Sequence, residues 1–482
     1  MTFPMYRRHF LQLSLATAGA ALLSQCARSE ASPAILTSQG GLLELNLEAK
    51  PQRLSLGRQS VHVLAYNGQI PGTRLEVRSG DTLRIHFTNS LNSPTNLHYH
   101  GLHIPPTGSA DNAFLDLPPG ESFTYEFALP PDHPAGTFWY HPHRHGLVAE
   151  QVFGGLAGLL IVRGDLDEIP EVQSASEEFL VLQDFEPDPN TLPMPMTHML
   201  EMWGREGSLL TVNGQVNPTF TLPQDGLLRL RLLNASASRF YRLMLEDHPL
   251  YLIASDGGAL AEPVEVPELL LTPGERAEVL IQGNRKAGAY RLMTLPYDRG
   301  IQSMMDGMMG GGMQGHMGRR QQLSTTPQVL ATVVYGDRTT PLSLPQQLLP
   351  VDPLPEPQRV REFTLNHGMS PQVGVGFLIN DKAFDHHRVD TQTTLDQVED
   401  WDIINLGGMD HPFHLHVHPF QVVSRNGVAE PYRAWKDTVL VRQTETVRIR
   451  VAFRDFPGKT VYHCHILDHE DKGMMGILEV TT

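Results

Sequence analysis

The sequence predicts an all-β protein made of three sandwich-like domains. Several segments alternate apolar and polar residues with a period of two, among them residues 228–232 (Leu-Arg-Leu-Arg-Leu) and 447–451 (Val-Arg-Ile-Arg-Val). That period is typical of a half-buried strand, and no long stretch of the chain shows the period of an amphipathic helix. A turn-and-strand pattern also occurs three times, which indicates three related β units.

The repeated pattern consists of a turn and a later strand that ends in asparagine. The turns lie at residues 66–72, 212–218 and 379–384, and the strands end at Asn89, Asn234 and Asn405. The first two turns contain Asn-Gly, a strong signal for a tight turn between strands, and the third copy is weaker. We therefore expect three copies of one arrangement of strands.

Two connectors divide the chain. Residues 163–178 are acidic and rich in turn residues, and residues 336–360 are rich in proline. Such segments are typical of links between domains. We therefore expect domains at 34–163, 178–336 and 360–482.

Composition excludes several classes of protein. The chain has 482 residues, 40% of them hydrophobic and 19% charged, which is the balance of a globular protein rather than a disordered or polytopic membrane protein. Its net charge of −16 disfavours a nucleic-acid partner, because such partners need clustered lysine and arginine. Two cysteines, Cys26 and Cys464, cannot form a disulfide framework. The 23 histidines and 18 methionines together favour a transition metal.

The first 31 residues have the features of an export signal. A basic segment containing Arg7 and Arg8 precedes a short apolar run at residues 13–23 and a small-residue cleavage site. The paired arginines resemble a twin-arginine signal, which would use the twin-arginine export machinery. We expect a mature monomer without a transmembrane segment, in the periplasm or outside the cell. Lipid anchoring at Cys26 is disfavoured, because Gln25 directly before it fits poorly.

The histidines concentrate in four motifs near the two ends of the chain. These are His98-Tyr-His100, His141-Pro-His143, His411-Pro-Phe-His414-Leu-His416 and His463-Cys464-His465, the last followed by His469 and Met474. Residues i and i+2 of a strand point to the same face, so each His-x-His pair presents two imidazoles together. The motifs belong to the first and third expected domains, which predicts a site shared between those domains.

The tripeptide His463-Cys464-His465 can link two metal centres. In an extended strand its imidazoles face one way and its thiolate faces the other. One thiolate, two imidazoles and one thioether are then available on the second face: Cys464, His411, His469 and Met474. That is the ligand set of a blue-copper electron-transfer site. The remaining eight histidines exceed the four ligands of an ordinary zinc site.

With these motifs the chain resembles the three-domain multicopper oxidases of the laccase-like bacterial type. The resemblance covers essentially the whole mature chain and implies three cupredoxin-like Greek-key β-sandwich domains. It implies four copper ions, namely one type 1 ion, one type 2 ion and a type 3 pair. The last three would form a trinuclear cluster between domains 1 and 3, with O2 as the electron acceptor.

The resemblance implies a ligand set for each ion. The type 1 copper would take His411, Cys464, His469 and Met474. The type 2 copper would take His98 and His414. One type 3 ion would take His100, His141 and His465, and the other would take His143, His416 and His463.

The same resemblance implies how electrons and protons move. A reducing substrate would give one electron at a time to the type 1 copper, and Cys464 would pass it toward the trinuclear cluster through the adjacent histidines. Four electrons and four protons would convert O2 into two waters. Asp111 resembles the family's acid near the type 2 copper and Glu470 its acid near the type 3 pair, so we expect both to relay protons.

A methionine-rich tract at 303–318 bears on the substrate. Among its glycines stand Met304, Met305, Met308, Met309, Met313 and Met317. A glycine-rich tract cannot form a packed core, and thioethers are soft ligands that select Cu(I). The tract resembles the insert of bacterial cuprous oxidases, and Met409 matches a substrate-site methionine of that group. The insert here is shorter, and Gly407 stands where that group carries an acid.

These features predict an exported multicopper oxidase that oxidises Cu(I) and also phenols. A laccase acting mainly on phenols or aromatic amines stays open as an alternative, with the tract serving only as a linker. A copper-binding or storage protein is a further alternative, although storage needs no O2 chemistry. A structural protein that has lost its copper is disfavoured, because no ligand of the family's set is missing.

Overall fold

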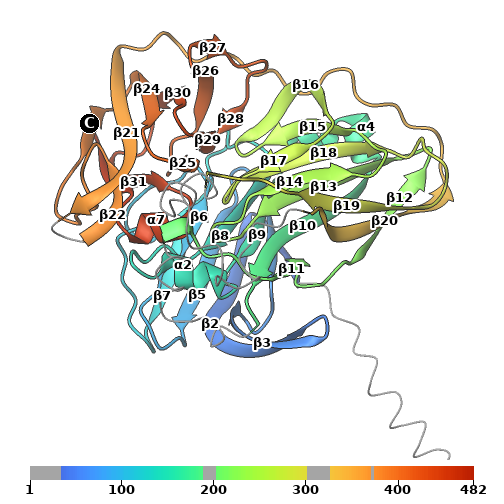
Figure 1. Cartoon of the computed structure of the whole chain (residues 1–482), viewed down its shortest axis with the longest axis horizontal. Helices are drawn as coiled ribbons and strands as arrows, with labels where there is room; N and C mark the ends of the chain where they lie inside the picture. Colours follow the sequence, from blue (N-terminus) through green and yellow to red (C-terminus); the bar gives the residue numbers. More distant parts are fainter. Residues whose placement is uncertain (1–33, 188–201, 301–325, 371–373) are drawn as a thin grey trace, which may run out of the picture. The chain divides into compact units, whose positions relative to one another are not determined.

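A computed structural model of the chain describes residues 34–187, 202–300, 326–370 and 374–482. Residues 34–482 form one compact unit, and the export signal expected at residues 1–31 lies outside the described residues. The prediction of an all-β fold is confirmed, because the described residues form six sheets and only short helices (Figure 1). None of the helices described is both long and apolar enough to cross a membrane.

The first pair of sheets comes from residues 35–163. One sheet has the strand order β1-β4-β9-β8-β6 and the other β3-β2-β5-β7. Leu75, Ile85 and Phe138 belong to the core of this pair. The elements up to residue 173 are β1 (Ile35–Thr37), β2 (Leu42–Leu56), β3 (Gln59–Tyr66), β4 (Gly72–Arg78), β5 (Thr82–Asn89), β6 (His98–His100), β7 (Ser122–Ala128), β8 (Gly136–His141), α2 (Val148–Phe153), β9 (Gly158–Arg163), α3 (Asp165–Glu168) and α4 (Pro170–Gln173).

The middle pair of sheets comes from residues 176–338. Its strand orders are β11-β10-β13-β18-β15-β16 and β12-β20-β19-β14-β17, and its core includes Leu230, Leu243 and Val279. The elements are β10 (Ser176–Phe185), β11 (Leu209–Val212), β12 (Thr219–Gln224), β13 (Leu227–Asn234), β14 (Tyr241–Leu245), β15 (Leu250–Ser255), β16 (Gly258–Val266), β17 (Leu269–Leu271), β18 (Arg276–Gln282), β19 (Ala289–Leu295) and β20 (Gln328–Arg338).

The third pair of sheets comes from residues 359–481. Its strand orders are β22-β21-β24-β30-β26-β27, with β28 also on β26, and β23-β32-β31-β25-β29. Phe363, Trp401 and Ile449 belong to its core. The elements are β21 (Arg359–Ser370), β22 (Gly374–Ile379), β23 (Thr391–Thr394), β24 (Gln397–Asn405), β25 (His411–Leu415), β26 (Phe420–Arg425), β27 (Val428–Ala429), β28 (Trp435–Lys436), β29 (Thr438–Val441), β30 (Thr446–Phe453), β31 (Gly458–Cys464), α7 (Leu467–Asp471) and β32 (Met475–Thr481).

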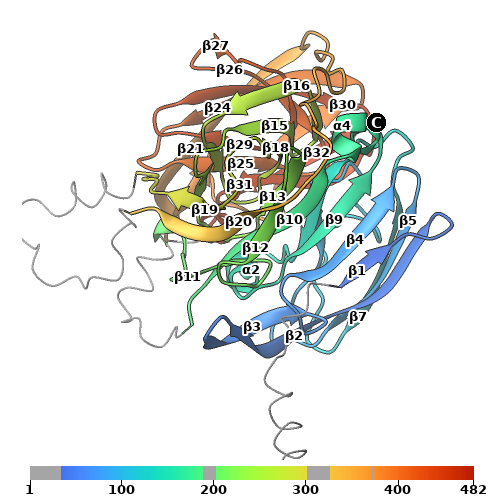
Figure 2. The same cartoon turned by 90° about the vertical axis from the view of Figure 1, so that its right-hand side faces the viewer.

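The three pairs pack against one another within the compact unit. Leu159 and Ile161 of β9 share a buried cluster with Phe179 and Val181 of β10, and Figure 2 shows these two strands side by side. The acidic connector expected at 163–178 contains the short helices α3 and α4. Apolar packing therefore continues from the first pair of sheets into the middle pair.

The three asparagines that end the repeated strands hold equivalent places. The Nδ2 atoms of Asn89, Asn234 and Asn405 donate hydrogen bonds to the backbone carbonyls of Leu117, Leu271 and Val441, at 2.8, 2.9 and 3.0 Å. Each Oδ1 accepts a hydrogen bond from the N–H two residues further along the chain. The repeat expected from the sequence is therefore present as three copies of one hydrogen-bonded corner.

These corners establish which strands correspond. In the three five-stranded sheets, β8, β19 and β31 are neighbours of β6, β14 and β25 respectively. In the first and third sheet pairs these strands carry the histidine motifs, and Figure 1 shows β6 and β8 close to β25 and β31. In the middle pair, β14 and β19 carry none.

Candidate metal centre

Antiparallel pairing brings the histidine motifs together two strands at a time. In the first sheet pair, His98 lies opposite His141 across β6 and β8. In the third, His414 lies opposite His463 and Phe413 opposite Cys464 across β25 and β31. All eleven histidine and cysteine ligands expected from the sequence are buried, as is Met474.

The cysteine of β31 meets two histidines on one side of the strand. Its Sγ lies 3.4 Å from His411 Nδ1 and 3.8 Å from His469 Nδ1, and those two nitrogens are 3.3 Å apart. A metal ion inside such a triangle, with bonds of ~2.0 Å to imidazole and ~2.3 Å to thiolate, would set the nitrogens about 3.5 Å apart and each about 3.7 Å from sulfur. The observed triangle is therefore close to the size that a trigonal site requires.

The environment of this triangle fits a soft metal site. Burial raises the pKa of the Cys464 thiol, so the free thiol is neutral and a bound metal is what would favour the thiolate. The Met474 carbonyl accepts a hydrogen bond from the Cys464 N–H, and the Met474 N–H donates to the His469 carbonyl. These bonds place the Met474 backbone beside the triangle, and a thioether is the fourth ligand that a blue-copper site would take.

A second group forms where the first and third sheet pairs meet. His463 Nε2 lies 3.1 Å from His143 Nε2 and 3.0 Å from His416 Nε2. His463 donates its Nδ1–H to the Cys464 carbonyl, which leaves its Nε2 as a lone-pair donor. Three imidazole nitrogens thus converge from two distant parts of the chain, as one type 3 ion would need.

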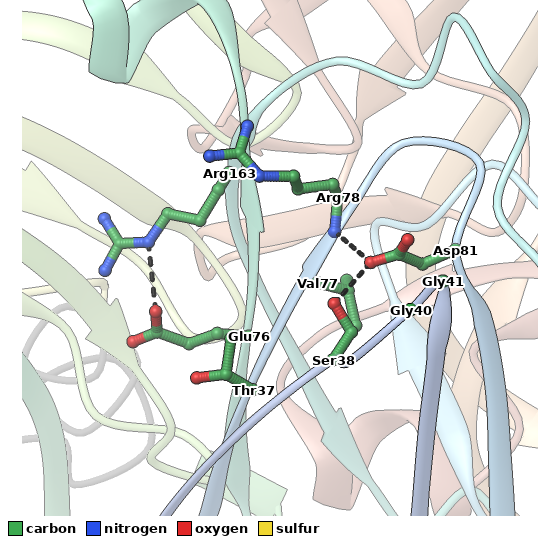
Figure 3. Close-up of a pocket in the computed structure, with 9 residues that line it drawn as sticks. All are labelled: Thr37, Ser38, Gly40, Gly41, Glu76, Val77, Arg78, Asp81 and Arg163. Carbon is green, nitrogen blue, oxygen red and sulfur yellow. Dashed lines mark hydrogen bonds and ion pairs between the residues drawn. The ribbon is translucent and has the colours of Figure 1, made fainter.

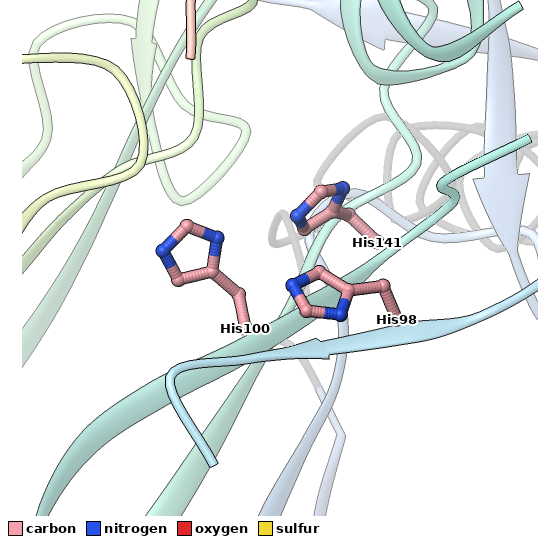
Figure 4. A group of neighbouring side chains, drawn as sticks. All are labelled: His98, His100 and His141. Carbon is pink, nitrogen blue, oxygen red and sulfur yellow. The ribbon is translucent and has the colours of Figure 1, made fainter. Parts of the chain in front are cut away.

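The remaining histidines gather beside this group. His98, His100 and His141 offer ligand atoms within 4.8 Å of one another, and Figure 4 shows their rings gathered near strand β6. The His465 ring lies 4.9 Å from the His100 ring and 5.7 Å from the His141 ring, measured between centroids. His98 and His414, expected to share the type 2 copper, have ring centroids 5.9 Å apart.

Several of these imidazoles present a nitrogen that has no hydrogen-bond partner in the described part of the chain. These atoms are His98 Nε2, His100 Nδ1, His141 Nε2, His414 Nε2 and both ring nitrogens of His465. The opposite nitrogens of His98, His141 and His414 donate to Asp111 Oδ1 at 2.7 Å, to the Pro142 carbonyl at 2.9 Å and to the Asp437 carbonyl at 2.8 Å.

Unpaired buried nitrogens of this kind need an explanation. Burial holds the pKa of His98, His141 and His465 well below the ordinary value, so these rings are neutral and can act as metal ligands. A metal ligand typically donates its other ring N–H to a carbonyl or carboxylate, which is the arrangement seen here. The residues present therefore fit copper ions.

Two buried carboxyl groups flank the cluster. Asp111 Oδ1 also accepts the Tyr99 N–H at 3.0 Å, and Asp111 Oδ2 lies 3.6 Å from His416 Nδ1. Burial raises the pKa of Asp111 to about 7. Glu470 lies 3.5 Å from His143 Nε2 and 3.3 Å from His463 Nδ1, and burial raises its pKa well above the ordinary value. Both acids therefore lie beside expected copper ligands, and their role as proton relays stays a prediction.

The methionines expected at the substrate site divide between two situations. Met409 is buried at 3% exposure, and its carbonyl accepts a hydrogen bond of 2.7 Å from Asn405 Nδ2. Met304, Met305, Met308, Met309, Met313 and Met317 lie outside the described residues. Their role stays a prediction.

Sequence reasoning missed three residues that contact the centre. Asp437 Oδ1 lies 3.0 Å from His100 Nε2, the Phe377 ring stacks on the His469 ring at 3.7 Å, and the Met202 carbonyl accepts a hydrogen bond from His469 Nε2 at 3.2 Å. None belongs to a motif with fixed spacing.

A surface hollow of about 440 Å³ lies elsewhere, on the first pair of sheets. Figure 3 shows that several of its polar groups are paired with one another. Asp81 accepts hydrogen bonds from Ser38 Oγ at 2.5 Å and from the Arg78 N–H at 2.8 Å, and Glu76 pairs with Arg163 at 3.1 Å. No histidine lines this hollow, so it is separate from the metal centre.

Comparisons with known proteins point to one family. Three family models described as multicopper oxidase match residues 48–167, 178–313 and 354–482. The chain is similar to multicopper oxidase mco of Staphylococcus epidermidis, with 31% identity over 429 residues that cover 87% of this chain and 84% of that protein. It is also similar to cell division protein FtsP of Yersinia pestis, with 31% identity over 501 residues and 98% of each chain covered.

A solved structure extends the likeness to three dimensions. The multicopper oxidase from Campylobacter jejuni, described as a metallo-oxidase, matches with a TM-score of 0.79 at 32% identity. The match covers 94% of this chain and 95% of that one. The comparison of folds thus agrees with the comparison of sequences: both find similarity to a multicopper oxidase.

Proposed function

The chain belongs to the multicopper oxidase family, and we propose that it oxidises Cu(I), and also phenols, with O2 as the electron acceptor. The observation that carries this proposal is the pair of ligand groups joined by His463-Cys464-His465. Cys464 Sγ belongs to the triangle with His411 and His469, and the next residue on each side belongs to the histidine cluster. One covalent bridge thus connects the two groups.

The proposed ligand sets are those implied by the family resemblance. Four copper ions would be held: a type 1 ion in the Cys464 triangle with Met474, a type 2 ion by His98 and His414, and a type 3 pair by the other six histidines. When bound, copper would supply one-electron oxidation of the substrate and four-electron reduction of O2 to water. Cys464 would conduct electrons through the backbone to His463 and His465.

The two buried acids would supply protons. Asp111 Oδ2 and both carboxylate oxygens of Glu470 have no hydrogen-bond partner in the described residues. Asp111 lies on the His98 side of the cluster and Glu470 on the side of His143 and His463. We propose that each carboxyl holds a proton near the cluster and delivers it during the reduction of O2.

Two contacts near the triangle favour Cu(I) over a bulky donor. His469 is fully buried, Phe377 stacks on its ring, and its Nε2 is bonded to the Met202 carbonyl. No ring edge of His469 is therefore exposed to receive a phenol directly.

Two described residues shortly before the methionine-rich tract contact the neighbour of His411. The backbone carbonyl of Arg299 accepts a hydrogen bond of 2.8 Å from the N–H of Asp410, the neighbour of His411. Tyr297 Oη also donates to Asp410 Oδ2 at 2.7 Å. Thioethers select Cu(I), so we propose that the tract and Met409 guide Cu(I) to the type 1 site.

The alternatives differ in what they require. A laccase would need an accessible donor site beside His469, and a copper-storage protein would have no use for a complete trinuclear ligand set. A role in cell division is a second candidate function, because the FtsP match covers 98% of both chains. A strain lacking the gene would separate the two: restored division by a Cys464→Ser chain would favour the cell-division role over the oxidase.

The proposal includes export and a monomeric state. The pair Arg7 and Arg8 supports the twin-arginine route to the periplasm or beyond. Replacing both arginines with lysine should retain the precursor in the cytoplasm, as fractionation and immunoblotting would show. Export at the wild-type level would contradict the twin-arginine route.

The substrate is tested by O2 consumption with Cu(I) and, separately, with a dimethoxyphenol. Two variants of the copper-loaded protein are compared with wild type: deletion of residues 303–318, and replacement of the six tract methionines by leucine at unchanged length. We expect both variants to lose Cu(I) turnover while phenol turnover survives or rises. Unchanged Cu(I) turnover with phenols as the better donors would make the tract a linker and the protein a laccase.

A further inference from the structure

The middle pair of sheets supplies no histidine to the cluster within the described residues, yet one of its segments touches the cluster. Residues 274–276 lead into β18. Gly274 has a φ of +84°, and a Cβ there would lie 2.8 Å from the His465 ring. Only a residue without a side chain can approach the imidazole this closely. The segment therefore lies directly against an expected copper ligand.

Arg276, at the start of β18, makes the strongest contacts in this segment. Its side chain is 0% exposed, and all five guanidinium N–H groups are used. Nε donates to the Thr137 carbonyl at 3.0 Å, one Nη1–H to the Gly274 carbonyl at 3.1 Å and one Nη2–H to the Asp256 carbonyl at 2.9 Å. The other two N–H groups grip Asp437, at 2.8 and 2.5 Å.

Asp437 in turn forms hydrogen bonds with two expected copper ligands. Its Oδ1 accepts from His100 Nε2 at 3.0 Å, and its backbone carbonyl accepts from His414 Nδ1 at 2.8 Å. The other ring nitrogens, His100 Nδ1 and His414 Nε2, have no hydrogen-bond partner in the described residues. The orientation and tautomer of both rings are therefore set from the Asp437 side.

At this junction, acids of the middle sheet pair bind a base of the third pair, and a base of the middle pair binds an acid of the third. Asp256 and Glu275 of the middle sheet pair bind Lys436 at 2.9 and 3.1 Å, while Arg276 binds Asp437. Burial raises the pKa of Asp437, but the charge and hydrogen bonds of Arg276 outweigh it and hold the pKa well below the ordinary value. Without Arg276, Asp437 would be a buried charge lacking its main partner.

The internal repeat shows that the arginine is special to the middle copy. The N–H groups of Asn89, Asn234 and Asn405 donate to the carbonyls of Glu121, Glu275 and Glu445. The residues that follow these glutamates are Ser122, Arg276 and Thr446. Ser122 is exposed and Thr446 half-buried, so only the middle copy places a buried cation at this position.

A glycine of the first sheet pair leaves space for the ion pair between Arg276 and Asp437. Gly101 directly follows His100 and has a φ of +88°. A Cβ at Gly101 would lie 2.7 Å from Asp437 Oδ2 and would also collide with the Arg276 guanidinium. Three parts of the chain thus meet at one ion pair.

We propose that Arg276 is a positioning residue, which acts through Asp437 to hold His100 and His414 in the orientation that binds the trinuclear copper. This inference rests on the proposed function, since it concerns the same copper site. It gives the middle sheet pair a specific task in a site to which it contributes no ligand.

The test follows the stability of the type 2 copper rather than turnover. Copper-loaded wild type and Arg276→Met are titrated with EDTA, and the type 2 electron paramagnetic resonance signal is measured together with the blue absorption of type 1 copper. Substitution of a residue that orients a metal ligand typically lowers the affinity for the metal by about 10- to 100-fold. We expect half of the type 2 signal to be lost at a correspondingly lower EDTA concentration, with the blue absorption retained.

Arg231→Met is the matched control. Arg231 is a buried arginine on the adjacent strand β13, and it pairs with Glu177 and Glu278 rather than with a residue that holds a histidine. It should lose type 2 copper at the wild-type EDTA concentration. If both variants lose it equally, or if Arg276→Met behaves as wild type, the positioning role is wrong.

Arg276→Lys decides the question if Arg276→Met does not fold. Lysine keeps the charge but cannot form the two-pronged bond to Asp437, so we expect an intermediate EDTA concentration. A wild-type result for this folded variant would overturn the proposal. A wild-type protein that never shows type 2 or blue copper would instead overturn the proposed function, so the two failures are distinguishable.

Discussion

Strands β14 and β19 of the middle sheet pair and strands β25 and β31 of the third have the same places in their sheets but carry different chemistry. Tyr241 pairs with Leu271 where His411 pairs with Val441. Met244 therefore corresponds to His414. Across the sheet, Met293 corresponds to His463 and Thr294 to Cys464. The middle copy has tyrosine, methionine or threonine at each of these positions, where the third copy has an expected metal ligand.

This difference distinguishes the residues that the fold requires from the residues that a metal site would require. The middle copy keeps the asparagine corner at Asn234 and a complete apolar core without any ligand. The histidines and the cysteine of the third copy are therefore not required for the strands to pair and pack. Metal binding, as proposed above, would instead account for their burial with unpaired nitrogens.

The largest expected effect follows from giving the third copy the middle copy's residue at the cysteine. Cys464→Thr should abolish the blue absorption and reduce substrate oxidation to background, because no thiolate remains to hold the type 1 copper. Absorption spectroscopy and O2 consumption measure both. The corresponding change in the middle copy, Thr294→Ser, should leave both unchanged. Blue absorption that survives Cys464→Thr would show that Cys464 does not bind the type 1 copper.

A second exchange tests the histidine pair. His414→Met with His463→Met should prevent loading of the trinuclear copper, as the copper-to-protein ratio would show. The metal-free protein should remain folded, and each change should lower the free energy of unfolding by about 1–3 kcal/mol, because each leaves a backbone carbonyl without a buried hydrogen bond. Loss of the folded state in circular dichroism would show that the fold does depend on these histidines.

The residues behind the ligands allow a finer test. Asp111→Asn keeps the size of the side chain but weakens the hydrogen bond that orients His98. We expect type 2 copper affinity or turnover to fall by about 10- to 100-fold. Asp116→Asn, on an exposed carboxylate paired with Arg144, is the control and should have no effect. Equal values for wild type and Asp111→Asn would contradict the orienting role.

The smallest effect concerns the shared corner. Asn234→Ala and Asn405→Ala each remove hydrogen bonds to buried backbone groups, so each should lower the free energy of unfolding by about 1–3 kcal/mol. Only Asn405→Ala should also shift the blue absorption, because Asn405 holds the Met409 carbonyl near His411. If the blue absorption band shifted equally in both variants, the effect of each corner would not be local. Chemical denaturation and absorption spectra provide the two measurements.

Much of the fold and the centre could be predicted from the sequence because the signals are local. The period of two identifies strands, and the spacing of His98 and His100 places both side chains on one face of a strand. The opposite directions of Cys464 and its two neighbours follow from the same geometry, and the structure shows them in separate groups. The boundaries of the three expected domains stay a prediction.

The rest depends on contacts between distant parts of the chain. Asp437 lies 337 positions from His100 in sequence, and nothing in its own neighbourhood indicates a role beside a metal ligand. Arg276 lies 161 positions from Asp437. Such pairs are created by the packing of one sheet pair against another, which no local period encodes.

The decisive measurement is the copper content of the purified, copper-loaded protein, determined by mass spectrometry against protein concentration. If the first and third sheet pairs build one type 1 site and one trinuclear site, the ratio should be four copper ions per chain. A chain that folds but binds no copper, or that holds a single ion, would contradict the account.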